Sequence, residues 1–233
     1  MATFGLVHGA WHGSWQWERL RPELEGLGHS VRTVDLPCED PGAACSAYAA
    51  IVVEALSGSD DDLILVGHSL GGLTVPIAAS ELQVRHLVFL CSVLPVPGIS
   101  LVDQLQAEPS MARRDEYAAG LSDPDDLGRN RWIDFEIAWR SFYGDCDENA
   151  ARAAFYRLRP QATAPYVEPC PLERLPDVER TYVVCSDDGI VNAEWATGAA
   201  RARLGVEPVN LPGSHSPFLS RPSELARLLA GLV

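Results

Sequence analysis

One short segment of the sequence combines a nucleophile with the small residues that a sharp turn needs. The segment Gly67–Gly71 reads Gly-His-Ser-Leu-Gly, with an apolar run at 63–66 before it and helical spacing from Leu70 onward. A strand, a tight turn and a helix in this order hold a serine hydroxyl above the strand end, where it can attack a carbonyl carbon. The helix N-terminus offers amide donors for the developing oxyanion. We therefore expect Ser69 to be a nucleophile; a glycine-rich turn with an incidental serine is the alternative.

A serine nucleophile needs a base, and His215 is the best placed histidine. It follows the last predicted strand and precedes the final helix, whereas His86, the other histidine beyond Ser69, opens a strand. Asp187 and Asp188 come just after the penultimate predicted strand. One of these carboxylates would orient the imidazole and stabilise its charged form. The local sequence leaves the choice between the two open.

The end of the first predicted strand offers a backbone donor for an oxyanion hole. Gly9 lets the chain turn so that the Ala10 N–H can point at the serine, and the Leu70 N–H would be the second donor. His8 and His12 have metal-ligand spacing, but no acidic or thiol ligand lies nearby in sequence, so we interpret them as packed loop histidines. The sequence has neither a Walker A motif nor a G-x-G-x-x-G pattern. We therefore expect no metal and no cofactor.

Two tryptophans are candidates for substrate contacts. Trp11 follows the oxyanion loop, and Trp132 lies in the middle of the chain. In the functional interpretation both side chains line an aromatic acyl or alcohol pocket. Core packing is the alternative for each of them.

The elements that must position these residues follow an alternating order. Short apolar or β-branched runs without polar alternation are typical of strands buried on both faces of a parallel sheet. Helical stripes lie between these runs. The pattern predicts a doubly wound, mostly parallel α/β sheet within a single domain over 1–233. The strands are expected at 3–7, 31–34, 63–66, 86–91, 181–185 and 206–210.

The alternation stops between Cys91 and Thr181. We find no good strand in this stretch, which is far longer than the usual loop of ~2–6 residues between a strand and a helix. It shows helical patterns over 101–117, 132–142 and 149–158 instead. We interpret residues 96–178 as a helical cap inserted over one end of the sheet.

Composition narrows the classes of partner. The 233 residues carry 18 Lys and Arg against 32 Asp and Glu, a net charge of −14, which repels nucleic acid and anionic membranes. No apolar run approaches the ~20 residues of a membrane helix, and the N-terminus does not resemble a signal peptide. The six cysteines form no C-x-x-C pair. We expect a cytoplasmic protein with free thiols and a small-molecule ester substrate, and leave a monomer or a homodimer open.

These motifs together resemble a known family. The segments 7–15, 24–31, 66–73 and 92–95, together with the 187–190 turn and His215, are similar to the small α/β-hydrolases that include plant methyl esterases, plant hydroxynitrile lyases and related bacterial esterases. The resemblance implies the α/β-hydrolase fold, a Ser69 nucleophile and a His215 base. It also implies an oxyanion hole at Ala10 and Leu70. Because family members place Asp before a similar x-Gly-Ile stretch, it favours Asp187 as the acid.

Two departures bear on the reaction. The hydroxynitrile lyases of this family carry Thr where Gly9 stands and Lys where Ser216 stands. Their absence favours a serine hydrolase that cleaves a small carboxylic ester through a Ser-His-Asp triad and an acyl-enzyme. A lyase, a lactonase or another tailoring hydrolase on the same triad is the first alternative. A small-molecule receptor with a hydrolase fold is the second.

Overall fold

A six-stranded sheet forms the centre of the computed structural model, which describes residues 1–58 and 62–233. The strand order is β2-β1-β3-β4-β7-β8, and every pairing in this sheet is parallel. The predicted doubly wound sheet is therefore confirmed. The strands are β1 (Ala2–Val7), β2 (Ser30–Val34), β3 (Asp62–His68), β4 (His86–Leu90), β7 (Glu179–Cys185) and β8 (Val209–Leu211).

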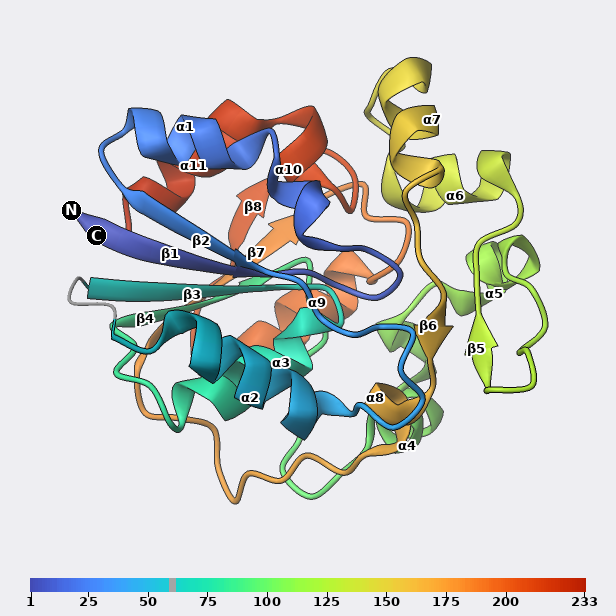
Figure 1. Ribbon diagram of the computed structural model, residues 1–233, viewed down its shortest axis with the longest axis horizontal. Helices are drawn as coiled ribbons and strands as arrows, with labels where there is room; N and C mark the ends of the chain where they lie inside the picture. Colours follow the sequence, from blue (N-terminus) through green and yellow to red (C-terminus); the bar gives the residue numbers. More distant parts are fainter. Residues whose placement is uncertain (59–61) are drawn as a thin grey trace.

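Helices cover both faces of the sheet, which explains why its central strands are apolar throughout. Figure 1 shows α1, α10 and α11 on one face and α2, α3 and α9 on the other. All residues of β1 and β4 are buried. These helices are α1 (Leu20–Gly26), α2 (Cys45–Leu56), α3 (Gly71–Ala79), α9 (Ala193–Ala199), α10 (Pro217–Ser220) and α11 (Pro222–Ala230).

The long connection between β4 and β7 is mainly helical, and it lies at the end of the sheet where the strands finish (Figure 1). It holds α4 (Leu101–Ala107), α5 (Arg114–Tyr117), α6 (Phe135–Phe142), α7 (Glu148–Phe155) and α8 (Ala164–Val167). It also contains a two-stranded antiparallel sheet of β5 (Arg129–Asn130) and β6 (Gln161–Ala162), which the sequence did not predict. The exact bounds of the cap at 96–178 stay a prediction.

The chain order of the strands places a crevice at the middle of the sheet. From β1 the chain goes outward to β2, then returns to β3 on the other side of β1 and continues to β4. In open α/β sheets, ligands bind beyond the carboxyl ends of the strands at such a reversal. The residues after β1 and β3 are those of the predicted oxyanion loop and serine turn. Among the described residues, no helix is long and apolar enough to cross a membrane.

Candidate active site

Ser69 occupies a strained turn between β3 and α3. Its φ is 53°, a left-handed conformation that side chains rarely adopt. The Ser69 N–H donates to the Leu90 carbonyl at 3.1 Å, which ties the turn to the end of β4. Glycine is required at Gly71, where a Cβ would lie 2.8 Å from the His8 carbonyl oxygen. The local geometry is that expected of a nucleophile turn, because strain of this kind persists only where the surroundings impose it.

His215 is fully buried and paired with a carboxylate. Its Nδ1 lies 2.9 and 2.8 Å from the two carboxylate oxygens of Asp188, which is itself 3% exposed. The N–H groups of Ile190 and Val191 donate to Asp188 Oδ1 at 2.8 and 2.9 Å and hold the carboxylate in place. Since a carboxylate only accepts hydrogen bonds, Nδ1 carries the proton of the neutral imidazole. The other nitrogen, Nε2, is buried and has no hydrogen-bond partner among the described residues.

The prediction that Asp187 faces His215 is wrong. The Asp187 side chain is exposed and accepts a hydrogen bond from Ser186 Oγ at 2.9 Å. Its N–H donates to the Gly213 carbonyl at 2.9 Å, so the backbone of Asp187 joins the turn to the His215 loop. In this turn the next side chain, that of Asp188, is therefore the one directed at the imidazole.

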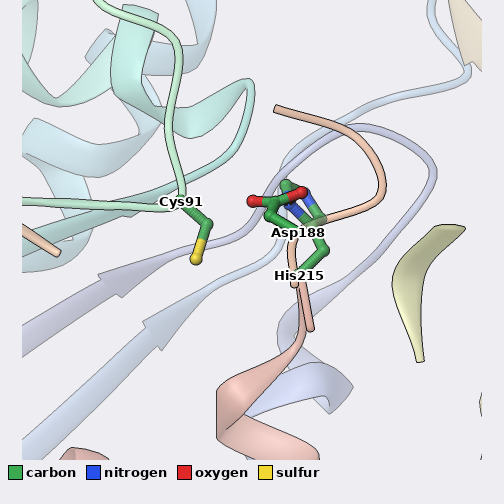
Figure 2. A group of neighbouring side chains, drawn as sticks. All are labelled: Cys91, Asp188 and His215. Atoms are coloured by element: carbon green, nitrogen blue, oxygen red, sulfur yellow. Dashed lines mark hydrogen bonds and ion pairs between the residues drawn. The ribbon is translucent and has the colours of Figure 1, made fainter. Parts of the chain in front are cut away.

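A cysteine lies beside this pair. Figure 2 shows Cys91, which follows β4, next to Asp188 and His215. Each of the three side chains has one atom that could bind a metal, and these atoms lie within 4.8 Å of one another. Burial raises the pKa of the Cys91 thiol well above its usual value, and the nearby Cys185 raises it further. The thiol is therefore neutral at neutral pH. A metal would need the thiolate and would displace the proton shared by Asp188 and His215, so these residues fit an acid–base pair better than a metal site.

Two residues with unused backbone amides lie beside the serine. Ala10, Ser69 and Leu70 line the same cavity. In the described part of the chain, neither the Ala10 N–H nor the Leu70 N–H donates to a protein acceptor. Gly9 approaches the serine so closely that a Cβ there would lie 2.7 Å from Ser69 Cβ. Two free donors next to a nucleophile are the arrangement that an oxyanion hole requires.

Neutral histidines surround the site. Burial lowers the pKa of His8 to about 4 and that of His12 to about 3. Burial also lowers the pKa of His68, whose Nε2–H donates to the His215 carbonyl at 2.9 Å. The rings of His68 and His215 are 4.6 Å apart, which places His215 beside the serine turn. No hydrogen bond joins Ser69 Oγ to His215 Nε2 in the described structure.

The cavity above Ser69 has a volume of about 50 Å³ and an apolar wall. None of the described residues that line it carries a charged side chain. Its wall is built by Trp11, Val93, Leu101, Leu105, Ala112, Tyr117, Tyr166, Ile190 and Val191.

Only one of the two predicted tryptophans reaches this cavity. Trp11 lines it and donates from Nε1 to Asn130 Oδ1 at 2.8 Å. Trp132 does not line it; its ring packs edge-on behind that of Trp11, with 5.8 Å between centroids, and also contacts Phe142. We therefore correct the expected role of Trp132 from substrate contact to support of Trp11.

Sequence reasoning missed the contacts that the cap makes with the oxyanion loop. Tyr143, directly after α6, lies 2.9 Å from His12 Nε2, and Gln161 accepts a hydrogen bond from the Trp11 N–H at 3.3 Å. No local pattern marks either residue, because each is more than 130 positions away from its partner in the chain.

Several known proteins are similar to this chain in sequence. A match to the Alpha/beta hydrolase family covers residues 6–228. The chain is 31% identical to a pyrethroid hydrolase of Sphingobium wenxiniae, over 97% of this chain and 85% of that protein. It is 27% identical to salicylic acid-binding protein 2 of Nicotiana tabacum, over 97% of this chain and 95% of the relative.

Solved structures share the fold. The crystal structure of polyneuridine aldehyde esterase superposes with a TM-score of 0.85 at 22% identity, covering 100% of this chain and 99% of the other. A pyrethroid hydrolase structure gives a TM-score of 0.81 at 25% identity, covering 99% of this chain and 96% of the other.

Proposed function

Because this chain belongs to the alpha/beta hydrolase family, we propose that it hydrolyses small carboxylic esters with Ser69 as nucleophile, His215 as base and Asp188 as the acid that orients the base. The observation that carries the proposal is the state of His215. Its Nδ1–H is held by Asp188, and its Nε2 is a buried acceptor that has no partner among the described residues, beside the serine turn. An unpaired buried acceptor costs free energy, and a role in taking up the serine proton accounts for that cost.

The reaction then proceeds in two halves. His215 Nε2 takes the Ser69 proton while Oγ attacks the ester carbonyl carbon, and the Ala10 and Leu70 amides hold the oxyanion. The imidazolium gives its proton to the departing alcohol, which leaves an acyl-enzyme. Water, deprotonated by His215, attacks the acyl carbon and releases the acid. Ser69 recovers its proton from the imidazolium.

The lining of the cavity sets the class of ester. Trp11, Tyr117 and Tyr166 with aliphatic neighbours present an apolar surface and no charge. Burying a charged group against such a wall is costly, whereas apolar groups gain free energy there. We therefore assign uncharged esters with apolar or aromatic groups as substrates. Curated relatives named as a pyrethroid hydrolase and as methylesterases support ester hydrolysis in general.

Cyanohydrin cleavage lacks the side chains it would need. Gly9 supplies no group for a substrate hydroxyl, and the close approach of Ser69 leaves no room there for a larger side chain without a shift. Ser216 is fully buried and uncharged, so it cannot stabilise cyanide. We expect no cyanide release from mandelonitrile above the buffer blank. Robust release without ester hydrolysis would overturn the proposal.

Turnover of 4-nitrophenyl acetate by wild type and by Ser69→Ala tests the mechanism. Loss of the nucleophile should lower kcat by about 10⁴- to 10⁶-fold with the fold intact. The matched control is Ser80→Ala at the other end of α3, which should keep full activity. A fluorophosphonate should label the Ser69 peptide in the wild type. Full activity of Ser69→Ala would exclude the mechanism, and binding of the ester without turnover would favour a receptor.

A further inference from the structure

Two buried imidazoles hold successive carbonyl groups of the loop that supplies the proposed oxyanion donor. His8 Nδ1 lies 2.9 Å from the Gly9 carbonyl oxygen, and His12 Nδ1 lies 2.8 Å from the Ala10 carbonyl oxygen. Both side chains are only 1% exposed. A carbonyl oxygen only accepts hydrogen bonds, so each Nδ1 must carry the proton.

The remaining ring nitrogens have donors that match this tautomer. The Leu36 N–H donates to His8 Nε2 at 2.9 Å. His12 Nε2 lies 2.9 Å from the Tyr143 hydroxyl, which must therefore be the donor. Each imidazole thus makes two hydrogen bonds of fixed direction. Because Tyr143 directly follows α6, the connection between β4 and β7 holds the second nitrogen of the His12 ring.

Peptide geometry converts these contacts into a direction for the Ala10 amide. The structure contains no cis peptide among its described residues, and in a planar trans peptide the C=O and the following N–H point in opposite directions. Holding the Gly9 carbonyl at His8 therefore turns the Ala10 N–H away from His8. The hydrogen bond from His12 to the Ala10 carbonyl fixes the peptide group that follows Ala10, so both peptide groups of this residue are held. The next residue, Trp11, has a φ of 59°, so this loop does not keep its shape by backbone preference alone.

We infer that His8 and His12 are positioning residues that aim the Ala10 N–H at the developing oxyanion, with the Tyr143 hydroxyl holding the second nitrogen of the His12 ring. This inference rests on the proposed function, because it gives the Ala10 amide a role in ester hydrolysis. Neither imidazole touches the substrate. A donor that is already aimed when the substrate arrives stabilises the transition state without reorganisation, so its effect falls on kcat rather than on substrate binding.

Substitutions at His8 separate aiming from simple packing. His8→Leu fills the space but removes the donor, whereas the amide of His8→Asn can donate from near the Nδ1 position. We expect His8→Leu to lower kcat for 4-nitrophenyl acetate about 10- to 100-fold with KM within about twofold, since removing an oxyanion donor outright costs 10²- to 10³-fold. His8→Asn should recover most of the loss. The matched control is His86→Leu, a buried histidine at the start of β4 and so at the opposite end of the parallel sheet, which should keep wild-type kcat.

Two further measurements keep the inference testable where a variant folds poorly. Rates are expressed per active site, titrated with a fluorophosphonate, and the affinity for phenylboronic acid, which mimics the tetrahedral adduct, should fall in proportion to kcat. The second measurement is made on the wild-type protein. With ¹⁵N-labelled histidine, long-range ¹H–¹⁵N spectra should show His8 and His12 protonated at Nδ1. Tyr143→Phe removes the hydroxyl that donates to His12 Nε2, so the ring is held at one nitrogen only and kcat should fall.

The outcomes are distinct. A raised KM with unchanged kcat in His8→Leu, or protonation of His8 and His12 at Nε2, would overturn the inference. So would full activity of His8→Leu while Ser69→Ala is inactive; the proposed function would then stand. Activity that survives in Ser69→Ala would remove the proposed function itself.

Discussion

The histidines around the site differ in one respect that decides their chemistry. His8, His12 and His68 each donate to a backbone carbonyl, and burial lowers the pKa of each, so they remain neutral at neutral pH. His215 instead donates to a carboxylate, and in the part of the chain that the structure describes its Nε2 has no partner. A carboxylate stabilises an imidazolium, whereas a carbonyl in an apolar surrounding does so much less. Of these four rings, His215 is therefore the one suited to accept a proton during turnover.

At the scale of single residues, the two neighbouring aspartates provide a direct test of the pairing with His215. Asp188→Asn removes the charge that stabilises imidazolium, and the amide can hold the wrong tautomer of His215, so kcat should fall by about 10⁴-fold. Asp187→Asn changes an exposed side chain and should keep kcat within about twofold. Side-by-side kcat values for 4-nitrophenyl acetate check this. Equal losses in the two variants would show that the pairing seen in the structure does not operate in catalysis.

The choice between those two aspartates also shows what sequence could not provide. The strand before them was predicted from its apolar run, because that pattern is local. Which side chain of a short turn faces inward depends on its contacts with other loops, here the bond from the Asp187 N–H to the Gly213 carbonyl. The resemblance to the family favoured Asp187, and the three-dimensional packing places Asp188 against His215.

At the scale of elements, the sheet was the most predictable part of the fold. Five of the six predicted runs lie within or mostly within observed strands, since buried parallel strands are apolar along their whole length. The last strand is β8, Val209–Leu211, shorter and later than the predicted run at 206–210. Its first two residues are exposed, so hydrophobicity could not mark it. The pair β5 and β6 was missed because each has only two residues.

Close packing of α3 against the segment after β4 gives a second test. A Cβ on Gly72 would lie 1.7 Å from Ser92 Oγ and 2.4 Å from the Val93 carbonyl oxygen. Gly72→Ala must therefore shift the backbone, and we expect it to lower the free energy of unfolding by at least about 2 kcal/mol. In the matched control, Gly198→Ala on α9, nothing lies within 4 Å of the new Cβ, so stability should rise by up to about 1 kcal/mol.

Urea unfolding of both glycine variants checks the packing argument. The two changes add the same methyl group to a helix, so they differ only in what surrounds it. Equal stability of the two variants would mean that α3 does not approach the Ser92 segment as closely as the structure shows.

At the scale of the whole molecule, the buried neutral histidines link stability to pH. The fold holds His8, His12 and His68 within a core, and the unfolded chain would protonate each of them near the ordinary histidine pKa of ~6.5. The titratable groups that act on His8 are Asp35, Glu39 and Arg159, and those that act on His12 are His8 and His215. Their effects are smaller than that of burial, which lowers the pKa of His8 to about 4 and that of His12 to about 3.

This difference predicts a loss of stability in acid well above the range in which carboxylates titrate. Between pH 6.5 and about 4 the unfolded state binds a proton at His8 and His12 that the folded state does not, so the free energy of unfolding falls as pH falls. Each histidine contributes about 1.4 kcal/mol per pH unit, and the two together should cost at least roughly 2 kcal/mol between pH 6 and pH 5. Urea unfolding at pH 7, 6 and 5 measures this slope.

The variant His12→Asn tests the assignment to the imidazoles. It keeps an amide donor for the Ala10 carbonyl but cannot be protonated, so its slope should be shallower by about one proton. A wild-type stability that is flat from pH 7 to pH 5, or an unchanged slope in His12→Asn, would show that these imidazoles are not kept neutral by the fold.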